Sequence, residues 1–412
     1  MEHASLLKAV SFCPLTSLSL LFLEVNATAI YSKRNRNQEA GVANSTSVKA
    51  AVLYEGNTHY EVKQLEQDPP GVGEVRVKMG ASGVCLSDHH FLHGDATIEK
   101  PIVLGHEGAG TVVEVGQGVT RVKPGDRCIL SFVSHCGMCR TCLNGFPNVC
   151  ETNVAIGPRM YDGTVRLHDN DKEIFQMSKL GVFSDLIICP QQACQPIPDD
   201  VPIEVAALIG CSVTTGVGGV INNPNSKMGM TVAVFGCGGV GLNVIQGAKL
   251  MNASRIIAID IVDHKLEFTY KFGATDTINS AEVEDVPSAI KELTGGGVDM
   301  AFDSIGNSQV TADTVKSIRP TGTAVMIGLS PVGDTTPIDM VDMLRGQKTL
   351  MGSYYGSTSP HESFRKIVDF YRKGDVDVEG LIQRIHPLDE INEAFSALDR
   401  REDGRGIIKF PD

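Results

Sequence analysis

Short apolar segments, separated by glycine and proline, follow one another along the chain from Val48 onward. Residues 49–53 are mostly apolar, residues 74–78 alternate apolar with charged side chains, and the Pro-Pro-Gly sequence at residues 69–71 predicts a turn between them. Short strands interrupted by glycine in this way are typical of an irregular β-rich domain. We predict such a domain at residues 48–212.

The pattern changes after residue 213, where predicted strands and helices alternate. Strands are predicted in four apolar runs, at residues 231–235, 255–260, 298–303 and 322–329. A helix is predicted to follow the first of these strands and to end near Met251. Alternation of this kind indicates a parallel, doubly wound sheet, here predicted at residues 213–353. The mixed segment 354–412 is predicted to return to the first domain, and the fold class is α/β.

Length and charge indicate two domains and make some functions unlikely. A chain of 412 residues exceeds the size at which one hydrophobic core keeps growing. Its 36 lysine and arginine residues and 49 aspartate and glutamate residues give a formal net charge of −13. A general nucleic-acid partner or an anionic membrane surface is therefore not expected. A neutral small-molecule substrate is compatible with this charge.

The first 47 residues differ from the rest of the chain. Their apolar run at residues 15–25 is interrupted by threonine and serine, and it is shorter than the ~20 residues of a membrane span. Two interpretations stay open for residues 1–47. They form a disordered extension, or they form a targeting segment whose cleavage site is the Ala-Thr-Ala sequence at residues 27–29.

Cysteine provides the clearest chemical signal. Four cysteines in fifteen residues have the spacing C-x2-C-x2-C-x7-C, and they are Cys136, Cys139, Cys142 and Cys150. Thiolates at such spacing bind one tetrahedral zinc ion more readily than they form disulfides. The other cysteines are scattered among apolar residues, and the total of 11 is odd. This usage indicates a reducing compartment, and we predict a cytoplasmic protein.

A glycine motif follows the first strand of the second domain. The sequence G-x-G-x-x-G is formed by Gly236, Gly238, Gly239, Val240 and Gly241. The first glycine permits a tight turn, the second permits close approach of a pyrophosphate, and the last permits close packing of helix on strand. The N-terminus of the helix presents unpaired N–H groups to the phosphates. The motif predicts a dinucleotide site.

The acid at the end of the next strand indicates which dinucleotide. Asp260 lies 19 residues after Gly241, where a carboxylate accepts hydrogen bonds from the adenosine ribose hydroxyls. The same carboxylate repels a 2′-phosphate, and no arginine occurs in residues 261–263. We therefore predict NAD rather than NADP as the cofactor.

A second set of possible zinc ligands is scattered along the chain. Cys85, His106 and Cys211 each lie in a glycine-containing segment, and each alone could be an ordinary buried residue. Together they would supply two thiolates and one imidazole. Three protein ligands leave the fourth position of zinc open for substrate, which distinguishes a catalytic site from a closed four-cysteine site.

These motifs occur in the order found in one family. The segments Gly-Val-Cys-x-Ser-Asp around Cys85 and Gly-His-Glu-Gly-Ala-Gly from Gly105, the four-cysteine lobe, Cys211 and the motif ending at Gly241 resemble the zinc-dependent alcohol dehydrogenases of the medium-chain dehydrogenase/reductase superfamily. The resemblance covers residues 48–412. It is strongest to the branch that holds the animal and plant alcohol dehydrogenases and the glutathione-dependent formaldehyde dehydrogenases.

The resemblance implies a fold and a reaction. The first domain would be a GroES-like catalytic domain and the second a Rossmann coenzyme domain. Two zinc ions per chain and NAD would serve the transfer of a hydride between an alcohol, which becomes an aldehyde or ketone, and the coenzyme. The small-molecule alcohol or aldehyde would be the main partner, and a homodimer or homotetramer is expected.

The resemblance also implies roles for individual residues. Cys85, His106 and Cys211 would bind the catalytic zinc, and the four-cysteine lobe the structural one. Ser87 would take the alcohol proton and pass it through the nicotinamide ribose to His90. The remaining assignments are Asp88 as the support of His106, Glu107 as a transient ligand behind the zinc, Phe132 as a wall of the substrate pocket, Lys265 and Arg405 at the ribose and phosphates, and Thr215 near the nicotinamide.

Two departures from the family pattern affect the coenzyme and the substrate. Leu86 stands where many relatives have a basic residue at the pyrophosphate, so we predict weaker NAD binding. No arginine directly follows Cys150, whereas formaldehyde dehydrogenases use one there to hold glutathione, and Arg159 is the available substitute. Simple or aromatic alcohols are the first expectation. An S-(hydroxymethyl)thiol, as in thiol-dependent formaldehyde oxidation, is the alternative.

Two functions without catalysis are less consistent with the sequence. A zinc-binding module for nucleic acid or protein contacts is usually small and basic, unlike this acidic chain. A catalytically dead relative would use the dinucleotide domain as a redox sensor, but the complete set Cys85, His106 and Cys211 and the pair Ser87 and His90 favour an active enzyme.

Overall fold

The structure is a computed structural model that describes residues 45–94, 96–402 and 404–411. The N-terminal extension is predicted at residues 1–47, of which residues 1–44 lie outside the described part. The first strand, β1, begins at Thr46, just before the predicted end of that extension. The ten cysteines of the described part form no disulfides with one another.

A closed barrel and a mixed sheet form the β-rich part of the chain. The barrel has the strand order β1-β2-β7-β8-β4. Its strands are β1 (Thr46–Leu53), β2 (Glu61–Gln67), β4 (Ile102–Val103), β7 (Leu167–Asp169) and β8 (Lys172–Gln176). The buried side chains of β1 fill the barrel core, which explains the mostly apolar sequence of this strand.

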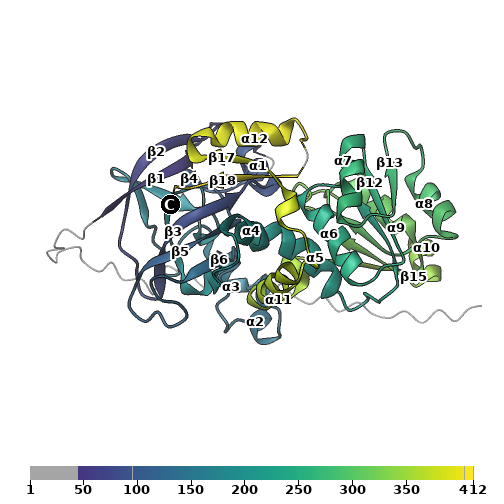
Figure 1. Cartoon of the computed structure of the whole chain (residues 1–412), viewed down its shortest axis with the longest axis horizontal. Coiled ribbons are helices and arrows are strands. Elements are labelled where there is room, and N and C mark those ends of the chain that lie inside the picture. Colours follow the sequence, from purple (N-terminus) through teal and green to yellow (C-terminus); the bar gives the residue numbers. More distant parts are fainter. Residues whose placement is uncertain (1–44, 95, 403, 412) are drawn as a thin grey trace, which may run out of the picture. The chain divides into compact units, whose positions relative to one another are not determined.

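The mixed sheet has the order β10-β6-β5-β3-β18-β17, and β9 also pairs with β3. Its strands are β3 (Glu74–Gly83), β5 (Gly108–Val115), β6 (Arg127–Leu130), β9 (Leu186–Pro190), β10 (Cys194–Pro196), β17 (Ile382–Pro387) and β18 (Arg405–Lys409). β18 pairs antiparallel with β3, although more than 300 positions separate them in the sequence (Figure 1). The C-terminal segment thus adds strands β17 and β18 to the sheet of the first part.

Short helices lie between the strands of this part. They are α1 (Leu86–His93), α2 (Arg140–Leu143), η2 (Pro147–Val149), α3 (Glu151–Ile156), η3 (Met177–Lys179) and η4 (Gln191–Ala193). Helix α1 follows the end of β3 after two residues and ends at Gly94, whose φ of 83° is the left-handed conformation that suits glycine.

The second sheet is parallel throughout and has the order β13-β12-β11-β14-β15-β16. Its strands are β11 (Thr231–Phe235), β12 (Arg255–Asp260), β13 (Asp276–Asn279), β14 (Val298–Asp303), β15 (Ile318–Met326) and β16 (Thr349–Gly352). Counted from β11, this order is 3-2-1-4-5-6, which is the doubly wound order of dinucleotide-binding folds. The prediction of a doubly wound parallel sheet is confirmed.

Helices cover both faces of this sheet (Figure 1). They are α6 (Gly239–Leu250), α7 (Asp263–Thr269), η6 (Tyr270–Phe272), α8 (Val286–Thr294), α9 (Ser308–Ser317) and α10 (Met340–Gly346). Along β11, Val232 and Val234 belong to one hydrophobic cluster and Ala233 and Phe235 to another. Burial on both faces explains why this strand has a continuous apolar sequence.

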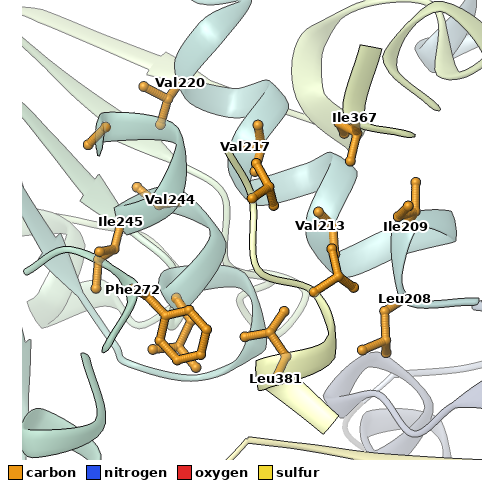
Figure 2. Packing of buried hydrophobic residues seen from close by; sticks show 14 of the residues in the cluster. Leu208, Ile209, Val213, Val217, Val220, Val244, Ile245, Phe272, Ile367 and Leu381 are labelled. Atoms are coloured by element: carbon orange, nitrogen blue, oxygen red, sulfur yellow. The ribbon is translucent and has the colours of Figure 1, made fainter. Parts of the chain in front are cut away.

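One long apolar helix connects the two parts of the chain. It consists of α4 (Ile203–Leu208), the π-helical turn η5 (Ile209–Val213) and α5 (Thr214–Ile221). Among the described helices it is long and apolar enough to cross a membrane, but 83% of it is buried inside the protein, as expected of a core helix. Figure 2 shows Leu208, Val213 and Val217 of this helix packed with residues of α6 and of the C-terminal segment.

The C-terminal segment contributes η7 (Tyr355–Ser357), α11 (Pro360–Lys373), η8 (Glu379–Leu381), η9 (Leu388–Glu390) and α12 (Ile391–Asp399). Ile367 of α11 and Leu381 of η8 belong to the same cluster as the long helix (Figure 2). The domain boundaries proposed from the sequence stay a prediction, because residues 43–412 form one compact unit.

Candidate functional site

Sheet register brings the scattered metal-ligand candidates to one end of the mixed sheet. β3 runs toward Cys85, and its residue Ser82 lies opposite Gly108, the first residue of β5, which follows His106 and Glu107. Gly83 of β3 lies opposite Ile407 of β18, so that Arg405 reaches the same end. Antiparallel pairing thus joins residues that the sequence separates widely.

Cys85, His106 and Cys211 form a group of three buried side chains whose ligand atoms all lie within 4.8 Å of one another. Cys211 comes from the π-helical turn η5, which packs against the ends of β5 and β6. A hydrogen bond with Cys211 and the charge of His106 lower the pKa of Cys85, although burial opposes this, and the thiolate is the form that binds metal. The donor set suits zinc with one open position.

Asp88 orients His106. One carboxylate oxygen of Asp88 lies 3.1 Å from Nδ1 of His106 and also accepts a hydrogen bond of 3.0 Å from the backbone N–H of Gly105. With Nδ1 engaged, Nε2 of the imidazole is the nitrogen left for a metal. Burial raises the pKa of Asp88, and the neighbouring His106 lowers it in part. The predicted supporting contact is present.

Glu107 lies behind the three ligands in a tightly enclosed position. One of its carboxylate oxygens accepts a hydrogen bond of 2.8 Å from the N–H of Ser212, the residue after Cys211. The other oxygen accepts a hydrogen bond from the buried guanidinium of Arg405, which also donates to the carbonyl of Val84 at 2.9 Å. Burial raises the pKa of Glu107, and the charge of Arg405 offsets this in part.

The tight fit around Glu107 explains a glycine at the end of β3. A Cβ atom placed on Gly83 would lie 1.9 Å from a carboxylate oxygen of Glu107, which is far inside van der Waals contact. Only glycine leaves room for the carboxylate at this point. The sequence alone does not mark Gly83 as essential, because the clash involves Glu107 from a distant segment of the chain.

Tyr355 holds the turn that carries Cys211. Its buried hydroxyl donates a hydrogen bond of 2.5 Å to the carbonyl of Gly210. Its φ of 52° is left-handed, which is unusual for a bulky residue and is retained only where surrounding contacts enforce it. A π-helical turn rearranges the local backbone hydrogen bonds and is often found at functional sites. The sequence analysis missed both Tyr355 and the π-turn.

An aromatic surface adjoins the histidine of this group. The ring of Phe132 lies 5.4 Å from that of His106 in an edge-to-face arrangement and stacks on Tyr355 at 3.8 Å. The ring of Tyr354 lies 6.1 Å from Phe132. The structure therefore brings Phe132 to the metal-ligand group and adds Tyr354, which the sequence analysis did not single out.

Ser87 and His90 lie three positions apart on α1 and are both partly exposed. Side chains at this spacing lie on the same face of a helix. Leu86, at the start of the same helix, is 51% exposed. Helix α1 thus presents the proton-transfer candidates directly after the candidate ligand Cys85.

The four-cysteine lobe follows β6 and includes α2 and η2. The Sγ atoms of Cys136, Cys139, Cys142 and Cys150 lie within 4.8 Å of one another. Backbone N–H groups point at two of these sulfurs: Cys139 N–H at Cys136 Sγ, at 3.3 Å, and Cys136 N–H at Cys150 Sγ, also at 3.3 Å. These hydrogen bonds favour the thiolate form and contribute to a lowered pKa of Cys136, against the effect of its burial, whereas burial raises the pKa of Cys150 despite them. The arrangement fits a closed four-thiolate zinc site.

The glycine motif forms the turn between β11 and α6. Gly236 has a φ of 91°, and a Cβ atom on Gly241 would lie 1.8 Å from the carbonyl oxygen of Gly236, so both positions require glycine. A Cβ atom on Gly238 would meet nothing within 4 Å, which leaves this backbone open to a ligand. Val240 lies partly exposed in the first turn of α6.

Four further coenzyme candidates belong to the neighbouring elements. Asp260 at the end of β12 accepts a hydrogen bond of 2.8 Å from the N–H of Cys237 inside the motif, and so fixes the turn. The side chain of Arg405 lies against Gly239, since a Cβ atom there would be 2.6 Å from its guanidinium. Thr215 in α5 and Lys265 in α7 are partly exposed.

Arg159 is engaged elsewhere. One of its guanidinium nitrogens lies 3.6 Å from a carboxylate oxygen of Glu99, and its guanidinium lies over the ring of Phe175 at 4.4 Å. These contacts leave it poorly suited to hold a glutathione carboxylate. Two surface hollows, of about 930 Å³ around Arg372 and about 470 Å³ around His386, are lined by none of the predicted site residues.

Comparisons with known proteins agree with this arrangement. The family model described as alcohol dehydrogenase GroES-like domain matches residues 71–199, and the model described as zinc-binding dehydrogenase matches residues 239–373. These matches confirm the predicted GroES-like domain in the β-rich part of the chain.

Individual relatives extend over nearly the whole described chain. A putative alcohol dehydrogenase D of Mycobacterium tuberculosis is 36% identical over 364 residues, which are 87% of this chain and 98% of the relative. The NDMA-dependent alcohol dehydrogenase of Amycolatopsis methanolica is 36% identical over 365 residues, with the same shares. The crystal structure of benzyl alcohol dehydrogenase from Acinetobacter calcoaceticus is similar with a TM-score of 0.84 and 31% identity, over 89% of this chain and 100% of that one.

Proposed function

The chain belongs to the zinc-dependent alcohol dehydrogenases of the medium-chain dehydrogenase/reductase superfamily, and from this we propose that it oxidises an alcohol with NAD at Cys85, His106 and Cys211. The observation that carries the proposal is the buried convergence of these three side chains, with their ligand atoms within 4.8 Å of one another. In the reverse direction the same site reduces an aldehyde or ketone.

The protein's contribution at this site is to hold and orient. Cys85, His106 and Cys211 would hold the catalytic zinc, Asp88 would keep Nε2 of His106 directed at it, and Glu107 would serve behind them as a transient ligand only. When bound, zinc acts as a Lewis acid that lowers the pKa of an alcohol hydroxyl and polarises a carbonyl oxygen. The buried surroundings of the ligands exclude water and so strengthen these electrostatic effects.

Ser87 and His90 provide the path for the alcohol proton. The Ser87 hydroxyl would take the alcohol proton while it gives its own to the nicotinamide ribose, and the ribose would pass a proton to His90, which releases it to solvent. Imidazole suits this task because it gains and loses a proton near neutral pH. The partly exposed position of both side chains supports the proposed path.

The glycine motif and the residues around it bind NAD. The N–H groups at the start of α6 face the pyrophosphate, and Arg405 adds positive charge beside Gly239. The Asp260 carboxylate can accept hydrogen bonds from the ribose hydroxyls, and its negative charge disfavours a 2′-phosphate. Both effects support NAD over NADP. Lys265 would contact the ribose and phosphates, and Thr215 would lie near the nicotinamide, the group that supplies the hydride chemistry.

An aromatic or simple primary alcohol is the proposed substrate class. The ring of Phe132 lies edge-to-face with His106 and Tyr354 lies next to Phe132, and aromatic substrates pack well on such aromatic surfaces. The similarity to a benzyl alcohol dehydrogenase supports the same choice. The engagement of Arg159 with Glu99 and Phe175 weighs against a glutathione adduct.

The four-cysteine lobe binds the second, structural zinc. We further propose a homodimer or homotetramer in the cytoplasm, the first from the family and the second from the free thiols of the described part. Light scattering coupled to gel filtration measures the assembly, and a monomeric mass would contradict it.

The decisive experiment is an NAD-reduction screen with primary, secondary and aromatic alcohols, and with formaldehyde in the presence and absence of thiols. We expect NADH formation with aromatic or simple alcohols and two zinc ions per chain. Cys211→Ala should abolish NADH formation and retain one zinc. Cys189→Ala, a change at a buried cysteine outside both groups, is the control and should retain both zincs and the activity.

Two results would contradict the proposal. One is the absence of NADH formation with every substrate of the screen in a protein that holds two zincs. The other is an activity that survives Cys211→Ala.

A further inference from the structure

A third group of possible metal ligands lies outside both zinc sites. His89 and His93 of α1 and Asp399, the last residue of α12, have ligand atoms within 4.8 Å of one another. The group joins α1 to α12, and His89 and Asp399 are 310 positions apart in the sequence. Neither the proposed reaction nor the structural zinc lobe uses any of these three side chains.

The geometry of the group is close to that of a chelating site. His89 and His93 are four residues apart, so that both imidazoles lie on the same face of α1. Their ring centroids are 4.1 Å apart, and Nε2 of His89 lies 2.7 Å from a carboxylate oxygen of Asp399. Ligand atoms around one tetrahedral zinc are about 3.3 Å apart, as follows from bond lengths of about 2.0 Å. Small rotations of these side chains therefore suffice to surround an ion.

The chemistry of the three donors selects the kind of ion. Two imidazole nitrogens and one carboxylate suit Zn²⁺, Co²⁺, Ni²⁺ and Cu²⁺, whereas Ca²⁺ and Mg²⁺ prefer sites made of oxygen alone. The spacing H-x3-H on one helix is also the spacing by which helices bind zinc in other proteins.

The electrostatics of the position favour a cation. Asp399 lies at the C-terminus of α12, and His93 lies in the last turn of α1, so that the negative ends of two helix dipoles meet near the group. The adjacent Arg400 does not supply the balancing charge, because its guanidinium donates to Glu393 at 2.8 Å and to Glu402 at 2.7 Å. A bound ion would neutralise Asp399 in this setting.

We propose that His89, His93 and Asp399 bind a third divalent transition-metal ion, in exchange with solvent. The side chain of His89 is 18% exposed and that of Asp399 53%, so the ion can enter and leave without unfolding. Three protein ligands leave room for water on the ion. The bound ion links α1 to α12 and thereby fixes the helix that carries Ser87 and His90.

The test counts metal on the tag-free protein that already holds its two zincs. Equilibrium dialysis against Zn²⁺, and calorimetric titration with Zn²⁺ and with Ni²⁺, measure the additional ion. We expect one further equivalent in the wild type, bound at least about tenfold more weakly after His93→Gln or Asp399→Asn. The matched control is His59→Gln at an exposed histidine outside the group, which should leave the third equivalent unchanged.

Thermal unfolding gives a second readout that does not depend on catalysis. Added Zn²⁺ should raise the Tm of the wild type and of His59→Gln, because the ion ties two helices together, and should not raise that of the two ligand variants. A wild-type count that stays at two, or a third equivalent that either ligand substitution leaves at full strength, overturns the proposal.

Discussion

The buried guanidinium of Arg405 donates a hydrogen bond to the buried carboxylate of Glu107, across 298 positions of sequence. The pair connects the first residue of β18 to the residue directly after His106, a member of the proposed metal-binding group. Arg405 also lies against Gly239 at the start of α6. One side chain thus contacts both the metal-ligand end of the mixed sheet and the coenzyme turn.

Removing this arginine should destabilise the protein strongly. Arg405→Met leaves the Glu107 carboxylate buried without its partner, which we expect to cost about 3–5 kcal/mol of unfolding free energy. Chemical denaturation measures the loss. The double variant Glu107→Gln/Arg405→Met should be more stable than Arg405→Met alone, and equal stability of the two would show that the unpaired charge is not the cause.

Gly83→Ala should impair the same site by steric conflict. The added methyl group would lie 1.9 Å from Glu107 and must displace it, at a cost of about 1–3 kcal/mol with a loss of activity. The control is Gly352→Ala, whose added methyl would meet nothing within 4 Å and should leave Tm and activity nearly unchanged. Equal behaviour of both variants in thermal unfolding and NADH formation would refute the steric argument.

Leu86→Arg should tighten the binding of NAD. Leu86 is 51% exposed at the start of α1, so an arginine there can reach a pyrophosphate while solvent screens part of its charge. We expect the Kd for NAD to fall about threefold to tenfold, and the gain to shrink at high salt. Fluorescence titration measures the Kd. Leu86→Gln, which adds no charge, serves as control, and a similar Kd in the two variants would contradict the prediction.

Cys142→Ser should lower stability first and activity only as a consequence. The change breaks the four-thiolate set, so we expect one zinc instead of two and a loss of at least about 2 kcal/mol, seen as a Tm lower by several degrees. Protein that remains folded should still form NADH at low temperature. Complete inactivity of folded Cys142→Ser with the catalytic zinc in place would assign this lobe a direct role in the reaction.

Acid should destabilise the protein through His361 in α11. Burial, followed by the charges of Arg121 and His135, lowers the pKa of His361 to about 3. In the unfolded chain His361 takes up a proton near pH 6.5, whereas in the folded protein it does so only near pH 3. The stability that depends on neutral His361 is therefore fully present above pH 6.5 and is lost as the pH falls from 6.5 toward 3. Between pH 7.5 and 5.5 we expect a loss of about 1 kcal/mol that is absent in His361→Gln. Urea denaturation at both pH values measures it, and identical losses in the two proteins would contradict this assignment.

The sequence predicted the regular parts of the fold well. The predicted strands at residues 231–235, 255–260 and 298–303 coincide with β11, β12 and β14, because buried parallel strands have continuous apolar runs. β15 begins at Ile318 and ends at Met326, so it begins and ends earlier than predicted. Its first residues include proline and glycine, which the apolar pattern does not mark as strand. β2, β13 and β16 were missed, since they are short or rich in polar residues.

The sequence indicated the candidate metal ligands of the site but not the residues that hold them in place. Cys85, His106 and Cys211 stood in recognisable motifs, and the structure brings them together. The roles of Ser212, Tyr355 and Gly83 arise only from contacts between distant segments, such as the hydrogen bond from Tyr355 to Gly210. Nothing in the local sequence marks such contacts, because sheet register and helix packing create them.

The π-helical turn at Ile209–Val213 has a consequence for any attempt to redesign the long core helix. Before the turn, Ile203 fits against Gly80 of β3, and after it, Gly216 fits against Asn243 of α6. Each residue of a helix advances by about 100°, so a one-residue deletion that restored uniform α-helix would rotate one of these two faces away from its partner. Cys211 lies in the π-helical turn, between the two α-helical segments that pack on different partners. A regular helix would therefore present Cys211 less well to a metal ion.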